Sequence, residues 1–167
     1  SSVSCNRDDG MPETAVVDTT VQRSDLPKNA DHLIASMLGE TIYDATFTKK
    51  DKPNPFGTEV YKGESVKTIT KATTANAANG AVYDVVLSNG IELGFKQDGT
   101  WAYVDGKTNV LKYSVWNYLP APVNAAIRAS ANSITNIVKI EISTADVYTI
   151  TFQGGAVAKY NADGTAA

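Results

Sequence analysis

A chain of 167 residues is long enough to form one domain with a sizeable hydrophobic core, so it needs no disulfide or metal to hold that core together. Its 18 acidic and 15 basic residues are scattered, without the basic stripe that binding to nucleic acid requires. No apolar run approaches the roughly 20 residues of a membrane-spanning helix.

The N-terminal segment contains the only cysteine, Cys5. A single cysteine forms neither an internal disulfide nor a cysteine-based zinc site. Ser2-Val3-Ser4-Cys5 is similar to the end of a bacterial lipoprotein signal, and Arg7-Asp8-Asp9 is similar to the surface-export signal that follows it in some Gram-negative lipoproteins. We expect lipidation at Cys5, the alternative being a floppy tail with an incidental thiol. Residues 1–23 are expected to form a flexible tether with at most one short edge strand.

Two helices are expected, and both begin with a Leu-Pro pair. At Ser24 to Pro27, Ser or Asp can cap free N–H groups, and proline is tolerated in a first helical turn. Apolar residues then recur at helical spacing up to Met37, and Gly39 ends the helix. The same opening returns at Leu119-Pro120, before a shorter, alanine-rich helix.

The stretch Tyr83 to Thr100 occurs a second time as Tyr148 to Thr165, and the two align without a gap at an offset of 65. Each copy alternates apolar and polar residues on both sides of a turn, at Asn89-Gly90 in the first and Gly154-Gly155 in the second. Each copy therefore predicts a β-hairpin, and the chain is interpreted as an internal duplication.

A third strand is expected in each copy, because Ser133 to Lys139 matches Ser65 to Lys71 as S-[VI]-x-x-I-x-K. Turn residues, including Asn79-Gly80, separate consecutive strands, which predicts antiparallel pairing. The expected fold class is α+β, with two tandem helix-plus-strand repeats forming a curved antiparallel sheet backed by two helices. The repeats are assigned to residues 24–118 and 119–167.

The first repeat carries an insert, residues 40–64. Tyr43, Ala45 and Phe47 alternate with polar residues, and Glu59-Val60-Tyr61 is a candidate returning strand. The insert is interpreted as an added hairpin, or a loop with one strand. Between the repeats lies an aromatic connector, whose rings either fill the seam between the two units or line an exposed binding face. These aromatic residues are Trp101, Tyr103, Tyr113, Trp116 and Tyr118.

The Leu-Pro helix start and the pattern Y-x-V-x-L-x-N-G-x-E-L-x-F-x-x-D-G-x-W, present from Tyr83 to Trp101, resemble the PepSY-like, beta-lactamase-inhibitor-like periplasmic proteins. The resemblance covers nearly everything from Ser24 to Thr165. It implies a secreted bacterial setting, an open sheet face and binding rather than catalysis. The second copy departs from the pattern, with Ala166 in place of the tryptophan and Val157 in place of Glu92.

Catalytic and metal chemistry find little support in the residues. His32 is the only histidine and has no second histidine for a zinc set, and no strained turn presents a serine nucleophile. Asp98 and Asp163 precede glycines, which indicates tight turns; the alternative, a calcium site, lacks a D-x-D-x-D run. No cofactor-binding fingerprint is present.

The favoured interpretation is a non-enzymatic protein of the periplasm or outer-membrane surface of a Gram-negative bacterium. It would bind an envelope or secreted protein, in an inhibitor-like or docking role, through the open sheet face and the connector aromatics. The expected outward-facing residues are Asp84, Val86, Glu92 and Lys96. The alternative is a small-ligand module, for a glycan at Trp116 and Tyr118 or for calcium at the Asp-Gly turns.

Overall fold

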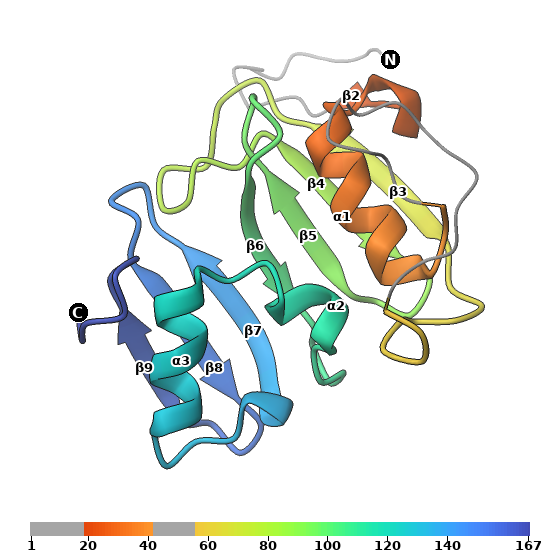
Figure 1. The fold of residues 1–167 in the computed structure, drawn as a ribbon. Coiled ribbons are helices and arrows are strands. Elements are labelled where there is room, and N and C mark those ends of the chain that lie inside the picture. Colours follow the sequence, from red (N-terminus) through yellow and green to blue (C-terminus); the bar gives the residue numbers. More distant parts are fainter. Residues whose placement is uncertain (1–18, 42–55) are drawn as a thin grey trace.

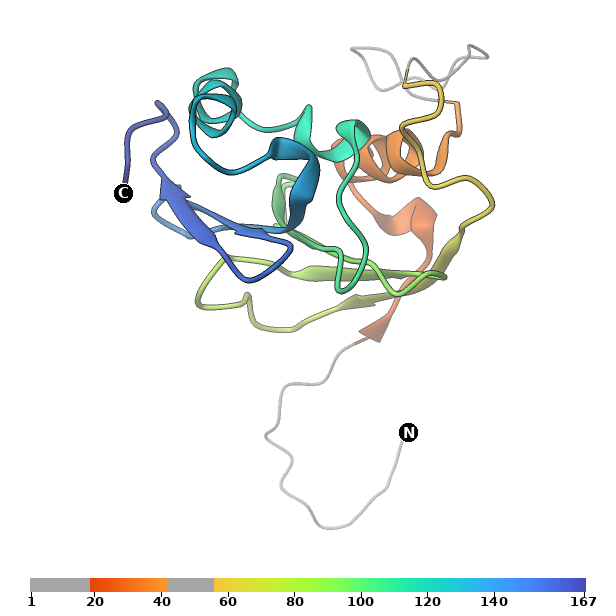
Figure 2. The same ribbon diagram turned by 90° about the horizontal axis from the view of Figure 1, so that it is seen from below.

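The computed structural model describes residues 19–41 and 56–167, in which one antiparallel sheet carries helices on a single face (Figures 1 and 2). The sheet has eight strands that lie in sequence order from one edge to the other. The strands are β2 (Thr19–Thr20), β3 (Val66–Lys71), β4 (Tyr83–Leu87), β5 (Glu92–Phe95), β6 (Trp101–Asp105), β7 (Ile137–Ile142), β8 (Tyr148–Phe152) and β9 (Val157–Tyr160). The helices are α1 (Lys28–Leu38), α2 (Tyr113–Trp116) and α3 (Ala121–Ala129), with 3₁₀ turns η1 (Arg23–Asp25) and η2 (Ile134–Asn136). The α+β class and the open antiparallel sheet are confirmed.

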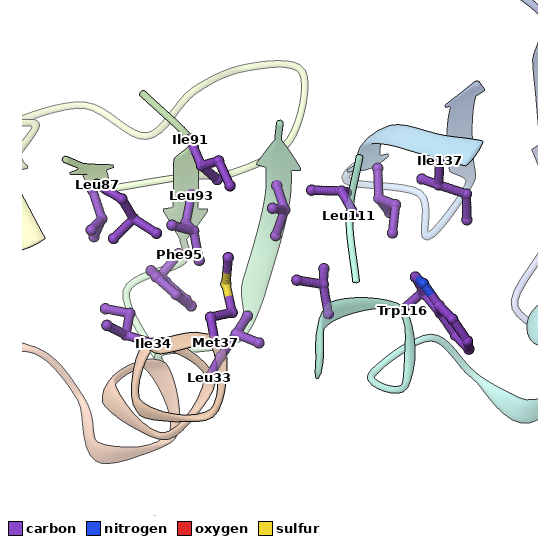
Figure 3. Close-up of a cluster of buried hydrophobic side chains, with 14 of the residues drawn as sticks. Leu33, Ile34, Met37, Leu87, Ile91, Leu93, Phe95, Leu111, Trp116 and Ile137 are labelled. Carbon is purple, nitrogen blue, oxygen red and sulfur yellow. The ribbon is translucent and has the colours of Figure 1, made fainter. Parts of the chain in front are cut away.

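Helix α1 forms where the apolar spacing predicts it. Pro27 precedes its first residue, and Gly39 ends it with a φ of 77°, a left-handed conformation that glycine adopts without strain. Leu33, Ile34 and Met37 lie in the core and point toward the inward-facing side chains of β4 and β5 (Figure 3). The helix therefore covers the first half of the sheet, and α3 covers the second half (Figure 1).

The β4–β5 and β8–β9 hairpins have the same register. Tyr83 pairs with Phe95 in the first hairpin, and Tyr148 pairs with Tyr160 in the second. Each residue of the second pair lies 65 positions after its counterpart in the first pair. Because the side-chain period of a strand is two residues, this shared register places equivalent residues on the same face of the sheet.

The predicted position of the strand before the second hairpin is wrong by three residues. The shared motif aligns Ile137 with Ile69. In the structure, Ile69 pairs with Val85, whereas Ile137 pairs with Phe152. Phe152 corresponds to Leu87 in the first hairpin and not to Val85, so the two isoleucines are not equivalent. The stretch before Ile137 forms η2, whose backbone N–H at Thr135 bonds to the Ser133 hydroxyl. A local hydrogen-bonded turn therefore competes with the strand at this point.

The candidate strand at residues 59–61 is also wrong, because residues 59 and 60 form a bend and residue 61 belongs to no strand. Tyr61 is buried and connects the segment to the rest of the molecule through two hydrogen bonds. Its backbone N–H donates to the Met37 carbonyl at 2.7 Å, and its hydroxyl donates to the Val110 carbonyl at 2.6 Å. The alternation at residues 43–47 lies outside the described residues, and so does Cys5.

The two halves meet at β6 and β7, which pair over three residue positions. The connector between them contributes α2, which packs against α1 and places Val115 and Trp116 in the core. Leu111 and Ile137 extend the same core under the seam (Figure 3). No helix among the described residues is long and apolar enough to cross a membrane.

Candidate functional site

The face of the sheet opposite the helices carries a polar depression of about 220 Å³. It lies where β4, β5, β6 and β7 run side by side, and inward-facing neighbours such as Val85, Leu93 and Val104 are fully buried on the other side. Because successive side chains of a strand point to opposite faces, the polar residues between these core residues face outward. The lining residues are Asn76, Asn79, Asp84, Glu92, Tyr103, Asp105, Lys139 and Glu141.

Tyr103 lines this depression and lies in the row of paired positions that runs from Asp84 through Gly94 and Tyr103 to Glu141. It pairs with Gly94 across β5 and β6, and a Cβ atom at position 94 would stand 2.0 Å from the ring carbon Cε2. The ring therefore lies against the β5 backbone, where only glycine leaves room for it. Its hydroxyl donates to Oδ1 of Asp84 on β4 at 2.7 Å. Burial, followed by this hydrogen bond, raises the pKa of Tyr103 well above its ordinary value, so the phenol is neutral at physiological pH.

Four carboxylates line the depression together with the Tyr103 ring, and their contacts differ. Nζ of Lys107 lies 3.4 Å from Glu92 and 3.6 Å from Asp105, an exposed pair of contacts that water screens. Glu141 accepts from the side-chain amide of Asn79 at 2.9 Å. Within residues 19–41 and 56–167, no three acidic, histidine or cysteine side chains are placed to hold a metal ion.

The loop of residues 72–82, between β3 and β4, closes one end of the depression. Asn79 is buried, and its side chain joins the Ala81 backbone N–H to Glu141. The Ala78 carbonyl accepts from the Thr144 backbone N–H at 3.3 Å, so the loop reaches from the first half of the sheet to the second. The loop thereby fixes the position of Glu141 relative to β4.

The structure brings together three of the eight side chains predicted to bind a partner: Asp84, Glu92 and Tyr103 all line the depression. Trp101 is half-buried and packs against the core, beside the irregular pairing at Gly94 and Phe95. The Lys96 side chain would contact a methyl group at Gly80, and it does not line the depression.

The remaining three, Tyr113, Trp116 and Tyr118, belong to the helix-bearing side. Trp116 is 7% exposed, and Arg128 lies over its ring at 5.2 Å. The Tyr118 hydroxyl lies 2.9 Å from the Ser36 hydroxyl and 2.8 Å from Nδ1 of His32, which ties the connector to α1. Tyr113 is 38% exposed and packs edge-on against Trp116.

The two Asp-Gly-Thr turns are held by the same side-chain hydrogen bonds. Asp98 accepts hydrogen bonds from the backbone N–H and the hydroxyl of Thr100, and Asp163 accepts the same pair from Thr165. These bonds, the hydroxyl first, lower the pKa of both carboxyls. Each turn also packs against the start of a helix: a Cβ at Gly99 would meet Asn29 and Pro27, and one at Gly164 would meet Pro122. Each Asp-Gly-Thr turn therefore contacts the residue two positions after the proline of the Leu-Pro pair, Asn29 in the first copy and Pro122 in the second.

The other five lining residues were not predicted from the sequence: Asn76, Asn79, Asp105, Lys139 and Glu141. The alternation Lys139, Ile140, Glu141, Ile142 contained the signal for β7, because apolar residues alternate there with charged ones. It was obscured by the alignment of Ile137 with Ile69. Asn79 has no such signal, since its bond to Glu141 spans 62 positions.

The comparisons with known proteins agree with this architecture. A family model described as "Putative beta-lactamase-inhibitor-like, PepSY-like" matches residues 81–166, about half of the chain. No curated protein matches. A solved structure from Bacteroides vulgatus, described as a "putative periplasmic protein of unknown function", is 21% identical, with a TM-score of 0.60, and the alignment covers 92% of this chain and 97% of that one.

Two further solved structures have TM-scores of 0.58, each with 86% of this chain and 89% of that chain covered. One, from Bacteroides vulgatus, is 19% identical and is described as a "putative periplasmic protein" of the DUF2874 family. The other, from Bacteroides thetaiotaomicron, is 16% identical and is described as a "putative calcium-regulated periplasmic protein". At these identities the likeness concerns the fold.

Proposed function

Because the chain belongs to the PepSY-like, beta-lactamase-inhibitor-like family, we propose that it is a non-enzymatic protein of the bacterial envelope that binds a protein partner through its open sheet face. The observation that supports this most strongly is the depression around Tyr103. Rigid strands hold its side chains, and it lies on the face that no described helix covers (Figure 2).

The chemistry of this face suits recognition better than catalysis. The Tyr103 hydroxyl is hydrogen-bonded, and Lys107 lies within ion-pair distance of two of the four carboxylates. General acid–base catalysis needs a closed site that separates two pKa values. A shallow face with an aromatic ring and clustered charges instead suits recognition of a partner surface of complementary charge.

Charge reversal on the face tests the proposal. The tagged protein is incubated with envelope extract from a Bacteroides species, and captured proteins are compared between the unmodified chain and the Glu92→Lys/Glu141→Lys variant. The variant is expected to lose the specifically captured protein. Glu59→Lys is the matched control, since Glu59 is exposed in the segment beside α1. Equal capture by all three proteins, with unchanged circular dichroism, contradicts the proposal.

An envelope location is proposed on the same basis, since the three similar structures are described as periplasmic. Lipidation at Cys5 would then anchor the chain to a membrane. Expression of the full gene in a Gram-negative host with a radiolabelled fatty acid tests this. Label is expected in the chain and absent from Cys5→Ser; label that survives the substitution contradicts the assignment.

Calcium is the second candidate ligand, because one similar structure is described as calcium-regulated. The Asp98 and Asp163 carboxylates already accept hydrogen bonds from threonines, which weakens this candidate. A ligand that binds only the native state raises the melting temperature. An unchanged melting temperature in millimolar calcium removes this candidate.

A further inference from the structure

The depression around Tyr103 indicates the chemistry of the partner group that the open face receives, given the proposed function. The Tyr103 ring packs on Gly94 and is half-buried, so the outer side of the ring forms part of the surface of the depression. An aromatic face carries negative electrostatic potential and attracts cations that lie over it. The hydroxyl bond to Asp84 fixes the ring in this position.

The charge around the ring points in the same direction. The depression is lined by four carboxylates and one lysine, Lys139, with Lys107 at its margin. Acid therefore exceeds base on this part of an otherwise polar sheet face. Within the described part of the chain, the carboxylates of Asp84 and Glu141 accept hydrogen bonds from neutral groups, the phenol of Tyr103 and the amide of Asn79.

The spacing of these groups favours a cation larger than a metal ion. No three of the acidic side chains within the described part of the chain converge closely enough to share a metal. A guanidinium group is planar, stacks on aromatic rings and donates several hydrogen bonds in a fixed fork, so it can reach carboxylates on different sides of a ring at once. An ammonium group is a compact, strongly hydrated point charge and uses this geometry less well.

We propose that the depression receives an arginine side chain of the partner protein, stacked on Tyr103 between Asp84 and Glu141. The loop of residues 72–82 then acts as the end wall of the site, because Asn79 holds Glu141 in place. Lys107 remains with Glu92 and Asp105 at the margin.

The probe is Nα-acetyl-arginine amide, titrated into the ¹⁵N-labelled protein and followed by NMR. Binding is expected in the millimolar range, since one side chain buries little surface and gains roughly a few kcal/mol. The backbone amides of Asp84, Gly94 and Tyr103 are expected to shift and saturate together. The neutral analogue Nα-acetyl-citrulline amide, which has nearly the same shape, is expected to cause no saturating shift.

Isosteric variants separate charge from shape. Asp84→Asn and Glu141→Gln keep an oxygen that accepts from Tyr103 and Asn79, and each is expected to raise the dissociation constant of the arginine probe up to about fivefold, as for a partly exposed ion pair. Glu59→Gln, which removes an acid outside the depression, is expected to leave it unchanged. Equal binding of citrulline, equal binding of Nα-acetyl-lysine amide, or saturating shifts confined to other residues each overturns the assignment of arginine.

The two proposals fail in different ways. If the arginine probe does not bind but the Glu92→Lys/Glu141→Lys variant loses its captured partner, this inference is wrong and the proposed function stands. If that variant captures the partner as well as the unmodified chain does, the proposed function is wrong whatever the titration gives.

Discussion

The Tyr103 ring lies against Gly94, its neighbour across the sheet, so closely that a methyl group at position 94 would stand 2.0 Å from the ring. Gly94 does not have a positive φ, so the glycine is required by the ring and not by the backbone. Glycine inside a strand commonly marks such a close approach.

Gly94→Ala is therefore expected to destabilise the protein by about 1–3 kcal/mol, because the ring must leave its position. Denaturation with urea measures this. In the Gly94→Ala/Tyr103→Ala double variant the clash is absent, so the added alanine is expected to cost almost nothing relative to Tyr103→Ala alone. A full cost in both backgrounds contradicts the steric explanation.

The sequence was sufficient for the parts of the fold that local patterns encode. Alternation about Asn89-Gly90 and Gly154-Gly155 predicted both hairpins, and helical spacing up to Gly39 predicted α1. These patterns work because a one-residue slip would move a whole apolar set to the wrong face. Helix α2, with four residues, is too short to show a period, and it was missed.

The depression could be predicted only in part, because it depends on contacts between distant residues. Asp84 and Glu92 were predicted from alternation and Tyr103 as an aromatic residue of the connector, but their common location with Glu141 follows from the pairing of β6 with β7. That pairing joins the two halves, and no local pattern specifies it. The connector aromatics were named together as candidates to bind a partner, but Tyr103 and Trp116 lie on different sides of the sheet, since α2 carries Trp116 to the helix side.

The Asp-Gly-Thr turns predict a contribution to acid stability. The pKa values of Asp98 and Asp163 are lowered from 3.8 by bonds from Thr100 and Thr165. A depressed folded pKa contributes stability that is present above the unfolded pKa and is lost as the pH falls through the folded pKa. Asp98→Asn and Asp163→Asn are thus expected to flatten the decline of unfolding free energy below about pH 4.

Carboxyl NMR titration measures the two pKa values, and urea denaturation from pH 2 to 6 measures the free energy of unfolding. Asp146→Asn is the control, since Asp146 is exposed and Asn tolerates its φ of 60°. If the free energy of unfolding declines below pH 4 with the same slope in the turn variants and in the control, the turns do not contribute to acid stability.

Tyr61 predicts a loss of stability at alkaline pH. Burial, opposed by a bond from the Lys112 backbone N–H, raises its pKa to about 12. A raised folded pKa gives stability that is fully present below the unfolded value near 10 and is lost as the pH rises through about 12. Tyr61→Phe removes this dependence, and it also costs about 1 kcal/mol at neutral pH through the lost bond to the Val110 carbonyl.

Ultraviolet difference titration follows phenol ionisation, and denaturation at pH 8 and pH 11 gives the two stabilities. The unmodified protein is expected to lose more stability between these pH values than Tyr61→Phe does. Tyr113→Phe is the control, because the Tyr113 side chain is more exposed. If Tyr61→Phe and the unmodified protein lose stability equally, Tyr61 is not the source of the alkaline transition.

Ser36 and Ser114 are both fully buried, and they are predicted to respond oppositely to removal of the hydroxyl. The Ser36 hydroxyl donates to the His32 carbonyl and lies 2.9 Å from the Tyr118 hydroxyl, whereas the Ser114 hydroxyl has no hydrogen-bond partner among the described residues. Ser36→Ala is expected to cost about 1–2 kcal/mol, because the Tyr118 hydroxyl loses a partner. Ser114→Ala is expected to be neutral or to stabilise by up to about 1 kcal/mol, because it removes a buried polar group without breaking a hydrogen bond.

Urea denaturation of the Ser36→Ala and Ser114→Ala variants side by side tests this prediction, since both lose one oxygen atom from a buried helical position. A cost for Ser114→Ala equal to that for Ser36→Ala would show that loss of packing volume, rather than hydrogen bonding, sets the energy at both positions.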